Sequence, residues 1–410
     1  MAKLGVIADD FTGAGDIASF LTAGGMRTIL IMQFQQSSHL QLHAADCDAI
    51  VIALKSRTEP VSKAVKDSIA ALHWLQDHAC HRFYFKYCST FDSTEKGNIG
   101  PVADALMDAL QVNQSILCPA LPVNGRTVRD GKLYVNGQLL EKSPMKDHPL
   151  TPMRNSDLVN LMAAQSRYSV RKIGKVHDGW HDCMTVKQRE YLVPDCETEN
   201  DLATIAEIFG HIPLLTGGSG LAYYLAKEYD SAEISHEAMT WQHEEGTAFL
   251  LAGSCNARTI EQIQMFHRHG GNIVALPVQN IINGTFDFDG FTKKIRPLLE
   301  KQNLLIYSSG KPEQIAAWQQ MDPCVSDKIE YVMGRLAQYA VSFGCQKIIV
   351  AGGETSGSVT KALDVKAALV GPSIAPGVPV MQDLYSSLKL VLKSGNFGQP
   401  DFFERAIQAL

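Results

Sequence analysis

Short apolar runs alternate with longer amphipathic segments along most of the chain, and this alternation predicts strands and helices in turn. In the first half the runs are rich in β-branched and aromatic residues, which favour strands. They predict strands at 4–8, 28–32, 49–54, 82–87, 115–118, 191–194 and 213–216. Helices are expected between them, for example over 60–79 and 199–209. Such alternation is typical of a parallel sheet covered by helices on both faces.

The pattern changes between residues 129 and 140. Asp130-Gly131 and Asn136-Gly137 are dipeptides favoured in tight hairpin turns, so a small antiparallel ribbon is expected there. The segment His148-Pro-Leu-Thr-Pro-Met153 follows, and its two prolines fix the backbone and forbid a helix. His148 is either a group that faces a ligand or a structural loop histidine, and the sequence leaves both open.

The second half repeats the strand and helix pattern after a polar, weakly patterned segment, 231–246, which we interpret as a linker. Apolar runs predict strands at 247–252, 273–278, 304–308, 347–351 and 388–393. A chain of 410 residues is long enough for two domains. The sequence therefore predicts an α/β protein with domains at 1–230 and 247–410. Each has a mostly parallel sheet flanked by helices, and the first carries a small antiparallel hairpin.

Composition narrows the functional classes. With 45% hydrophobic and 20% charged residues the chain is expected to be globular, and its net charge of -6 gives no electrostatic case for binding nucleic acid. No stretch approaches the roughly 18 consecutive apolar residues of a membrane span, and no secretory signal is visible at the start, so a cytoplasmic protein without membrane partners is expected. The nine cysteines show no C-x-x-C spacing, which favours reduced thiols over a zinc site.

The first predicted strand ends in Asp9-Asp-Phe-Thr-Gly-Ala-Gly-Asp16, which we expect to be a glycine-rich turn opening a helix that ends at Gly24-Gly25. A helix N-terminus beyond a strand tip presents N–H groups to an anionic ligand. The carboxylates of Asp9, Asp10 and Asp16 suit hydroxyl binding, proton abstraction or magnesium better than a bare phosphate.

Three interpretations of this turn remain open. Gly13-Ala-Gly-Asp16 imitates the signature of ribokinase-like sugar kinases, in which the last Asp is the base, although that signature lies far along the chain in those enzymes. Gly13, Gly15 and Ala18 fit a dinucleotide fingerprint, but no acidic residue closes a second strand about 20 residues on. The third interpretation is a tight turn with a capping Asp.

Further polar loops follow other strands of the first half, and the carboxyl ends of parallel strands meet at one edge of a sheet. Arg57 can bind both oxygens of a carboxylate, which makes the loop at 55–58 a candidate anion site, although a solvated loop is an equal alternative. A second glycine turn, 217–220, leads onto a helix N-terminus. The candidate substrate-binding residues are Thr12, Gly13, Lys55, Ser56, Arg57, Lys86, Asp92, Ser93, Thr94, Arg126, Gly217 and Gly218.

Three loops rich in glycine and hydroxyl groups follow strands of the second half. No Walker sequence occurs, so a bound nucleotide needs a different phosphate-binding site. Backbone N–H and hydroxyl groups can form such a phosphate cradle where side chains are small. Each loop alone could be an ordinary turn, and Ser254 could cap the helix that follows it. The candidate residues are Ser254, Gly352, Gly353, Glu354, Thr355, Ser356, Gly357, Ser358, Gly395, Asn396, Phe397 and Gly398.

These motifs resemble those of the four-carbon acid sugar kinase family. The resemblance rests on six segments that keep their order from residue 4 to residue 404. They are Gly5-Val-Ile-Ala-Asp-Asp-Phe-Thr-Gly13, Asp16-Ile-Ala-Ser19, the 148–153 segment, Gly352-Gly-Glu-Thr-Ser-Gly357, Gly371-Pro and Lys393-Ser-Gly-Asn-Phe-Gly398. Within the family the chain is most similar to members that act on 3-oxo-tetronates.

The resemblance implies that the N-terminal domain binds the sugar acid and the C-terminal domain binds ATP. A 3-oxo-tetronate would be phosphorylated on its terminal 4-hydroxyl, in carbohydrate acid catabolism, with Lys55, Arg57 and Lys86 as candidate partners of its carboxylate. Phosphoryl transfer also calls for Mg²⁺, for which Glu354 is the candidate ligand, and for an acidic base or orienting group, for which Asp10 is preferred over Asp9 and Asp16.

Two alternatives to this function stay open, and so does the oligomeric state. A relative could phosphorylate D-threonate or D-erythronate at the same hydroxyl. A second alternative is a nucleotide-responsive sugar-acid-binding module, although no output element such as a DNA-binding helix-turn-helix is visible. A homodimer is an open expectation.

Overall fold

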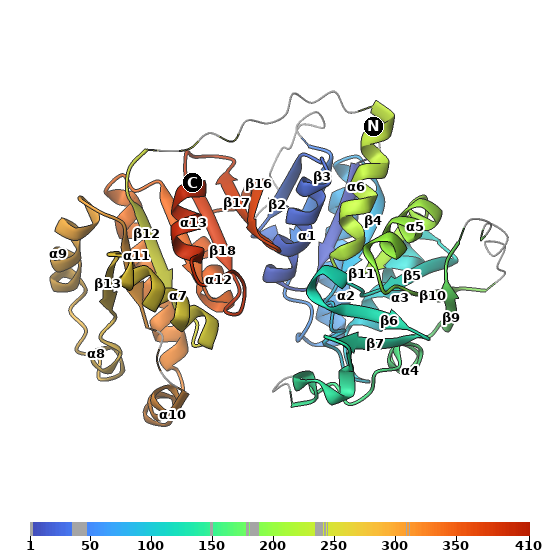
Figure 1. Cartoon of the computed structure of the whole chain (residues 1–410), viewed down its shortest axis with the longest axis horizontal. Helices are drawn as coiled ribbons and strands as arrows, with labels where there is room; N and C mark the ends of the chain where they lie inside the picture. The colour runs from blue at the N-terminus through green and yellow to red at the C-terminus, as the bar shows by residue number, and fades with distance from the viewer. Residues whose placement is uncertain are drawn as a thin grey trace. The chain divides into compact units, whose positions relative to one another are not determined.

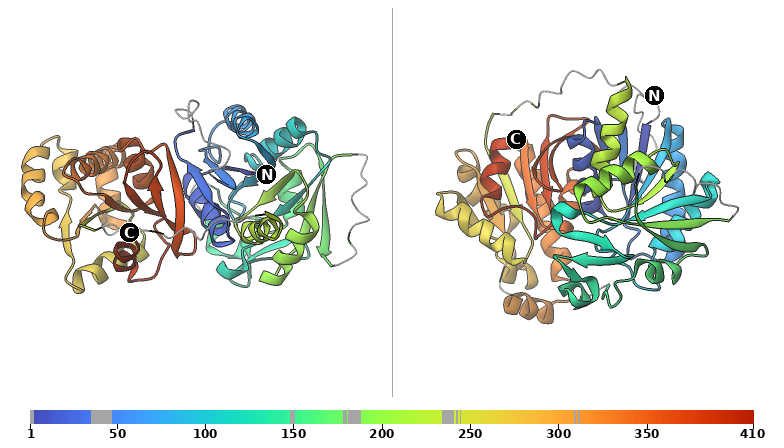
Figure 2. Two further views of the ribbon diagram at one scale, coloured as in Figure 1. Left: turned by 90° about the horizontal axis from the view of Figure 1, so that it is seen from above. Right: turned by 45° about the vertical axis from the view of Figure 1, so that its right-hand side comes forward.

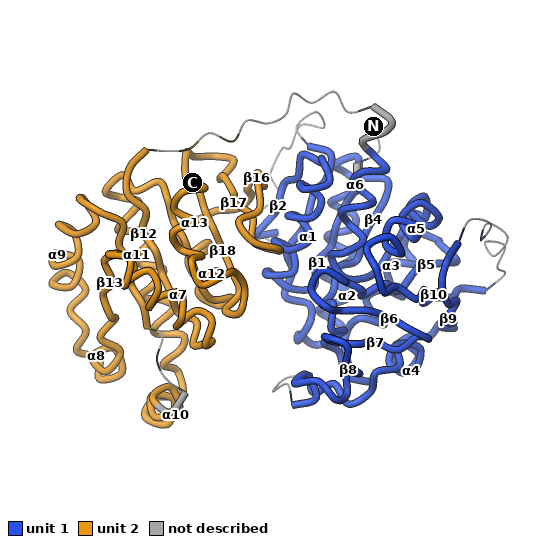
Figure 3. Tube along the Cα trace, in the orientation of Figure 1, with its two compact units in different colours: residues 1–237 blue, residues 238–410 orange. Residues whose placement is uncertain are grey.

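The computed structural model describes residues 3–34, 47–147, 151–177, 180, 188–233, 241, 243, 245–308, 310 and 312–410. It consists of two compact units, residues 1–237 and 238–410 (Figure 3). His148 and most of the predicted linker lie outside the described residues. Within the described part, no helix has the length and apolar character needed to cross a membrane.

Unit 1 is built on a sheet whose neighbouring strands are all parallel, in the order β2-β3-β1-β4-β11-β5-β10-β9 (Figure 1). The strands are β1 (Lys3–Ala8), β2 (Thr28–Ile31), β3 (Ala49–Ala53), β4 (Cys80–Lys86), β5 (Gln114–Cys118), β9 (Ser169–Lys175), β10 (Glu190–Asp195) and β11 (Leu214–Gly217). Every residue of β3, β5 and β11 is buried, as expected for strands covered on both faces.

Helices cover both faces of this sheet, with α1, α5 and α6 on one side and α2 and α3 on the other (Figure 2). The helices are α1 (Phe11–Ala23), α2 (Val61–Asp77), α3 (Ile99–Leu110), α4 (Leu158–Ala163), α5 (Glu199–Phe209) and α6 (Gly220–Glu233), with short 3-10 turns η2 (Pro122–Asn124), η3 (Leu140–Lys142) and η4 (Pro144–Asp147). A capping box between Thr198 and Asp201 starts α5. The predicted fold class is confirmed for this unit.

The predicted antiparallel ribbon is present in unit 1 as a separate small sheet. Its strands are β6 (Arg126–Arg129), β7 (Lys132–Val135) and β8 (Gln138–Leu139). Positive φ angles occur in both turns, at 51° and 72° in Asp130-Gly131 and at 51° and 79° in Asn136-Gly137. Glycine and asparagine adopt this backbone at little cost, which explains why the two dipeptides place the turns correctly.

Unit 2 contains a mixed sheet in the order β13-β14-β12-β15-β18-β17-β16, in which β16 and β17 form the antiparallel part. The strands are β12 (Ala248–Ala252), β13 (Asn272–Ala275), β14 (Leu304–Tyr307), β15 (Lys347–Ala351), β16 (Ala367–Ala375), β17 (Val378–Asp383) and β18 (Lys389–Lys393). β13 is shorter than the apolar run at 273–278 because Pro277 ends it and Val278 begins a helix.

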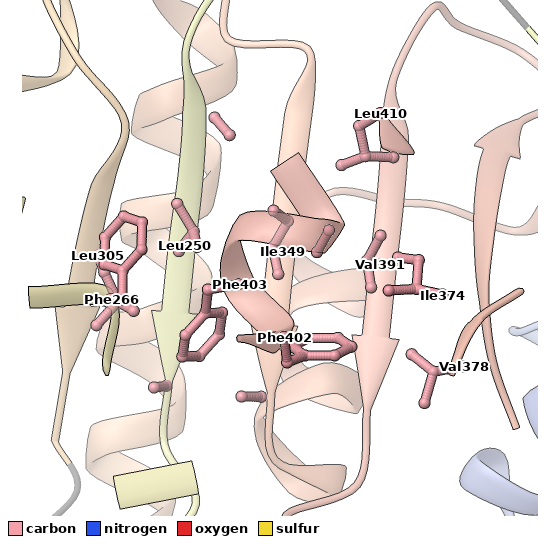
Figure 4. Close-up of a cluster of buried hydrophobic side chains, with 14 of the residues drawn as sticks. Leu250, Phe266, Leu305, Ile349, Ile374, Val378, Val391, Phe402, Phe403 and Leu410 are labelled. Carbon is pink, nitrogen blue, oxygen red and sulfur yellow. The ribbon is translucent and has the colours of Figure 1, made fainter. Parts of the chain in front are cut away.

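The helices of unit 2 are α7 (Ala257–Arg268), α8 (Val278–Ile282), α9 (Phe288–Leu299), α10 (Pro312–Met321), α11 (Val325–Ser342), α12 (Gly353–Ala362) and α13 (Phe402–Ala409). The core is clearest under α13, where Phe402 and Phe403 lie against Leu250, Ile349 and Val391 of three neighbouring strands (Figure 4). Burying two phenylalanine side chains contributes about 1.5 to 3 kcal/mol each, which fixes this C-terminal helix on the sheet.

Candidate active site

An acidic pair follows strand β1 at the carboxyl edge of the unit 1 sheet. Helix α1 begins already at Phe11, so Gly13, Ala14 and Gly15 lie inside the helix and the expected glycine loop is a short turn. Asp10 is the N-cap, and its Oδ1 accepts a hydrogen bond from the Gly13 N–H at 2.7 Å. A Cβ on Gly13 would lie 2.3 Å from Asp10 Oδ1 and 3.1 Å from Lys86 Nζ, so only glycine fits here.

The guanidinium group of Arg57 forms two hydrogen bonds with the carboxylate of Asp9. Arg57 Nε lies 2.9 Å from Asp9 Oδ2, and its NH2 lies 2.8 Å from Asp9 Oδ1 and 3.0 Å from Asp10 Oδ1. A third carboxylate, that of Asp92, is 3.8 Å from NH1. The protein's own acidic groups therefore engage Nε and NH2 of Arg57, whereas no hydrogen bond within the described residues uses NH1, so a role of Arg57 in binding a substrate carboxylate stays a prediction.

The loop that carries Arg57 is held by a residue at the start of helix α3. Asn98, at the start of α3, donates its side-chain amide to the carbonyls of Ser56 and Glu59 at 2.6 and 2.7 Å. This hydrogen bonding explains how a loop residue can keep a bidentate geometry. Asn98 carries no sequence signal beyond its place at a helix start, and the sequence did not predict its role.

A second ion pair lies under the first turn of α1. Lys86, at the end of β4, is buried, donates to the carbonyl of Tyr87 at 2.9 Å and lies 3.7 Å from Asp16 Oδ2. Burial raises the pKa of Asp9 and of Asp16, although Arg57 and Lys86 respectively oppose the shift. Lys86 is thus committed to the acidic cluster and is not free for a substrate carboxylate.

Of the three aspartates, Asp10 is the most accessible. Its side chain is 31% exposed, against 4% for Asp9 and 14% for Asp16. The two side-chain contacts of Asp10, with the Gly13 N–H and with Arg57 NH2, both use Oδ1. Within the described residues, no hydrogen bond or ion pair involves Oδ2, so this oxygen is available to a ligand at the carboxyl edge of the sheet.

The loop after β4 places its hydroxyl and carboxylate groups beside this cluster. Asp92 accepts a hydrogen bond from Thr90 at 2.6 Å, and Ser93 donates to Gln165 at 3.1 Å. The buried Ser56 hydroxyl, which has no hydrogen-bond partner among the described residues, lines a cavity of about 10 Å³ with Asp9, Arg57, Asp92 and Ser93. Such a cavity has room for about one water molecule and not for a sugar acid.

Ser93 also lines a larger cavity. It has a volume of about 360 Å³ and is lined by the 93–96 segment together with Pro152, Met153, Arg154, Asn155 and Leu161. Thr94, predicted from the sequence, is part of this wall, whereas Lys96 and Arg154 were not predicted. Neither cation forms an ion pair within the described residues, which leaves both available to an anionic ligand.

The remaining predicted substrate residues fall into two groups. Lys55 is exposed, Thr12 lies half-exposed in the first turn of α1, and Arg126 donates to the carbonyl of Asn124 in the ribbon. Gly217 and Gly218 pack against the loop after β5, where a Cβ would lie 2.1 Å from Cys118 O and 2.6 Å from Pro119 O respectively. The two glycines are therefore required for backbone packing.

In unit 2, the loops after β12, β15 and β18 meet because these strands are neighbours and parallel. The Gly253 and Ser254 N–H groups donate to the Ala351 carbonyl at 3.0 and 3.2 Å. A Cβ on Gly395 would lie 2.2 Å from Ser254 Oγ, and Gly352 has a φ of 136° that only glycine adopts readily. The three loops thus come together as a glycine-lined surface.

Two predictions for these loops need correction. Residues 353–358 form the first turns of α12 and not a loop. The N–H groups that can bind an anion here are therefore those of a helix N-terminus. The helix after β12 is capped by Asn256, whose side chain accepts from the Arg258 N–H at 2.9 Å, and not by Ser254.

The side chains of the 352–358 and 395–398 segments point in different directions. Thr355 reaches the first loop, since its Oγ1 would lie 2.1 Å from a Cβ on Gly253. Ser356 donates back to the Gly352 carbonyl, and Ser358 donates to Glu330 of α11. Glu354 and Asn396 are exposed, and the carbonyl of Phe397 accepts from the Gln262 side chain at 3.0 Å. Gly353, Gly357 and Gly398 can offer a ligand only their backbone groups. No group of three His, Cys, Asp or Glu side chains in the described part could hold a metal ion.

Sequence profiles of two domains match the chain. One, described as a sugar-binding N-terminal domain, matches residues 4–225, and the other, a nucleotide-binding C-terminal domain, matches residues 249–403. Curated 3-oxo-tetronate kinases are similar over nearly the whole chain. That of Brucella melitensis is 40% identical (98% of this chain, 95% of the relative), and that of Pectobacterium atrosepticum is 40% identical (99% of each).

Solved structures agree on the fold. A Haemophilus influenzae protein superposes with a TM-score of 0.82 at 38% identity, covering 98% of each chain. A Salmonella typhimurium protein described as a tRNA synthase has a TM-score of 0.89 at 38% identity, covering 99% of each chain. The chain belongs to the four-carbon acid sugar kinase family, a class of two-domain enzymes. Among its members, those it resembles in sequence are the 3-oxo-tetronate kinases, and the predicted enzyme class is confirmed.

Proposed function

We propose that this protein transfers the γ-phosphoryl group of ATP to the terminal 4-hydroxyl of a 3-oxo-tetronate. The curated relatives are named 3-oxo-tetronate kinases, and the two domain profiles describe a sugar-binding and a nucleotide-binding half. The observation that carries the proposal is the free Oδ2 of Asp10, a carboxylate oxygen held in place at the carboxyl edge of a parallel sheet.

In the sugar-binding half, Asp10 accepts the proton of the substrate hydroxyl. Asp9 orients Arg57, and Arg57 fixes the position of the Asp10 carboxylate through the 3.0 Å contact with Oδ1. The substrate carboxylate needs a cation that is not already paired. Lys96 and Arg154 in the 360 Å³ cavity meet that need, and with the exposed Lys55 they are the proposed partners in place of Arg57 and Lys86.

In the nucleotide-binding half, the phosphates lie against the N-terminus of α12 and the loops at Ser254 and Gly395. The free N–H groups of the first helical turn favour anions. Mg²⁺ fits this site, because the ion commonly keeps several waters and is bound by phosphate oxygens with only one or two carboxylates. Glu354, exposed in the first turn of α12, is the residue that would bind it, and the ion would neutralise phosphate charge.

Each bond that forms in the phosphoryl transfer is matched by a bond that breaks. The substrate O–H loses its proton to Asp10 Oδ2, its oxygen forms a bond to the γ-phosphorus, and the bond from that phosphorus to the β-phosphate oxygen breaks, releasing ADP. The protein contributes position and charge, which is the main source of catalysis in phosphoryl transfer. We further propose residues 1–230 as the sugar-acid domain, 231–246 as the linker and 247–410 as the ATP domain.

A screen of tetronates and 3-oxo-tetronates with an ATP-consumption assay tests this function. Consumption with a 3-oxo-tetronate, and a phosphorus NMR signal coupled to the C4 protons of the product, is the expected result. Consumption only with D-threonate or D-erythronate would replace the substrate by the reduced sugar acid. Binding of ATP and sugar acid without turnover of any compound would favour a nucleotide-responsive binding module.

A further inference from the structure

A buried lysine lies directly under the loops assigned to the nucleotide. Lys393 is the last residue of β18, and the residue is 2% exposed. Its Nζ lies 2.9 Å from the Thr259 hydroxyl, 3.2 Å from the Ser394 carbonyl and 3.3 Å from the Gly395 carbonyl. An ammonium group has three N–H donors, so these three acceptors satisfy it.

Side chains of helix α7 also hydrogen-bond to this loop. The Thr259 hydroxyl donates a hydrogen bond to the Gly395 carbonyl at 2.7 Å, and Gln262, one turn further along α7, donates to the carbonyls of Phe397 and Gln399 at 3.0 and 2.9 Å. The 394–399 loop therefore owes its shape to side chains beneath it. Gly395, at the centre of the loop, lies against Ser254 of the neighbouring loop.

We propose that Lys393 is a positioning residue for the nucleotide: with Thr259 it fixes the loop that completes the cradle, and it must be protonated to do so. The proposal rests on the assignment of the nucleotide to unit 2. Lys393 does not reach the phosphates itself, because its donors are already used, so it acts through Ser394 and Gly395.

The surroundings of Lys393 make its charge sensitive to pH. Within the described residues no carboxylate forms an ion pair with it. Its neighbours are Arg258 of α7, which is paired with Glu261 at 2.7 Å, and the ring of Phe402 of α13, whose centroid is 5.5 Å from Nζ. Burial, and then the charge of Arg258, lowers the pKa of Lys393 to about 7.

Deprotonation changes the hydrogen bonding of the loop. A neutral amine has two N–H donors and one lone pair, so one of the three oxygens loses its donor and faces that lone pair instead. Phosphates bound above the loop would favour the ammonium form. By linkage, nucleotide binding should therefore take up a proton near neutral pH, and affinity should fall as the pH rises through the pKa of the free protein.

Calorimetric titration of the full-length chain with ADP, in two buffers of different ionisation enthalpy, tests the proposal. For the wild-type chain we expect proton uptake and an increase in Kd of about tenfold from about pH 6 to about pH 8. Lys393→Arg keeps its charge at all these pH values, so it should bind with little of this pH dependence. Lys393→Met should bind about tenfold more weakly at the lower pH and lose the proton uptake.

Two further variants keep the test decisive. Lys361→Met, which changes an exposed lysine at the end of α12, should behave as wild type and corrects for the titration of ADP itself. Thr259→Val removes one acceptor and leaves the lysine, and should weaken binding if Lys393→Met does not fold. Wild-type affinity and pH dependence in both the Lys393→Met and Thr259→Val chains would overturn the inference, whereas a wild-type chain that binds no ADP would refute the proposed function.

Discussion

Replacing Asp10 by Asn separates its chemical role from its structural one. The Asn side chain keeps an oxygen that can accept the Gly13 N–H, and Asn is about as good an N-cap as Asp. The variant loses the negative charge 3.0 Å from Arg57, but the Asp10 side chain is 31% exposed, and such a pair contributes at most about 1 kcal/mol. We therefore expect the fold to survive nearly unchanged.

The turnover number should fall much further than the stability. Loss of a general base costs about 10² to 10⁴ in rate. That range corresponds to about 3 to 5 kcal/mol in the activation barrier. The measurement is a coupled assay of ADP release at saturating ATP and sugar acid, accompanied by urea denaturation to confirm the fold and by calorimetry to confirm ATP binding.

Asp9→Asn is the matched control, since it makes the same chemical change one residue away. Asp9 is 4% exposed and pairs with Arg57 through both oxygens, so its neutralisation should lower the free energy of unfolding by about 3 to 5 kcal/mol. Near-normal turnover in Asp10→Asn would remove Asp10 from the mechanism. A loss of turnover confined to Asp16→Asn, with a stable fold, would transfer the role to Asp16.

Three other substitutions test single contacts. Arg57→Ala should cost about 3 to 5 kcal/mol in urea denaturation because it leaves Asp9 buried without its partner, and a variant that instead raised only the KM of the sugar acid would restore Arg57 as a substrate ligand. Gly395→Ala should raise the KM for ATP about tenfold at unchanged KM for sugar acid, since its Cβ would lie 2.2 Å from Ser254 Oγ, and equal kinetics would show that the loop can shift. Thr198→Ala should lower the free energy of unfolding by about 1 kcal/mol without a kinetic effect, as measured by urea denaturation.

The fold was largely predictable because the strands of unit 1 are buried on both faces and read as continuous apolar runs. β9 escaped prediction since it is an edge strand with charged, exposed residues such as Arg171 and Lys172. β16 escaped because Gly371 and Pro372 interrupt its apolar run, and the strand pairing shifts register there. Both strands depend on a neighbour in space, which a local pattern does not contain.

The sequence predicted which residues lie at the candidate site, but not which of them form ion pairs with one another. Asp9, Asp10 and Arg57 stand at the ends of strands that any parallel sheet brings to one edge. The structure adds their distances, which show that at 2.8 to 3.0 Å the acidic groups engage Nε and NH2 of the arginine that the sequence suggested for a ligand. Lys393 is part of the motif Lys393-Ser-Gly-Asn-Phe-Gly398, but its burial and its hydrogen bond with Thr259 of α7 are visible only in the structure.

The position of β11 has a consequence for synthesis of the chain. This strand begins at residue 214 and lies between β4 and β5 in the sheet, although those strands end at residues 86 and 118. Until residues 214–217 leave the ribosome, β4 and β5 each have an open edge able to pair with another chain. Completion of the sheet requires a late central strand to insert between two early ones, a contact of long sequence separation that slows folding. An N-terminal half that lacks β11 therefore exposes strand edges on which aggregation can start.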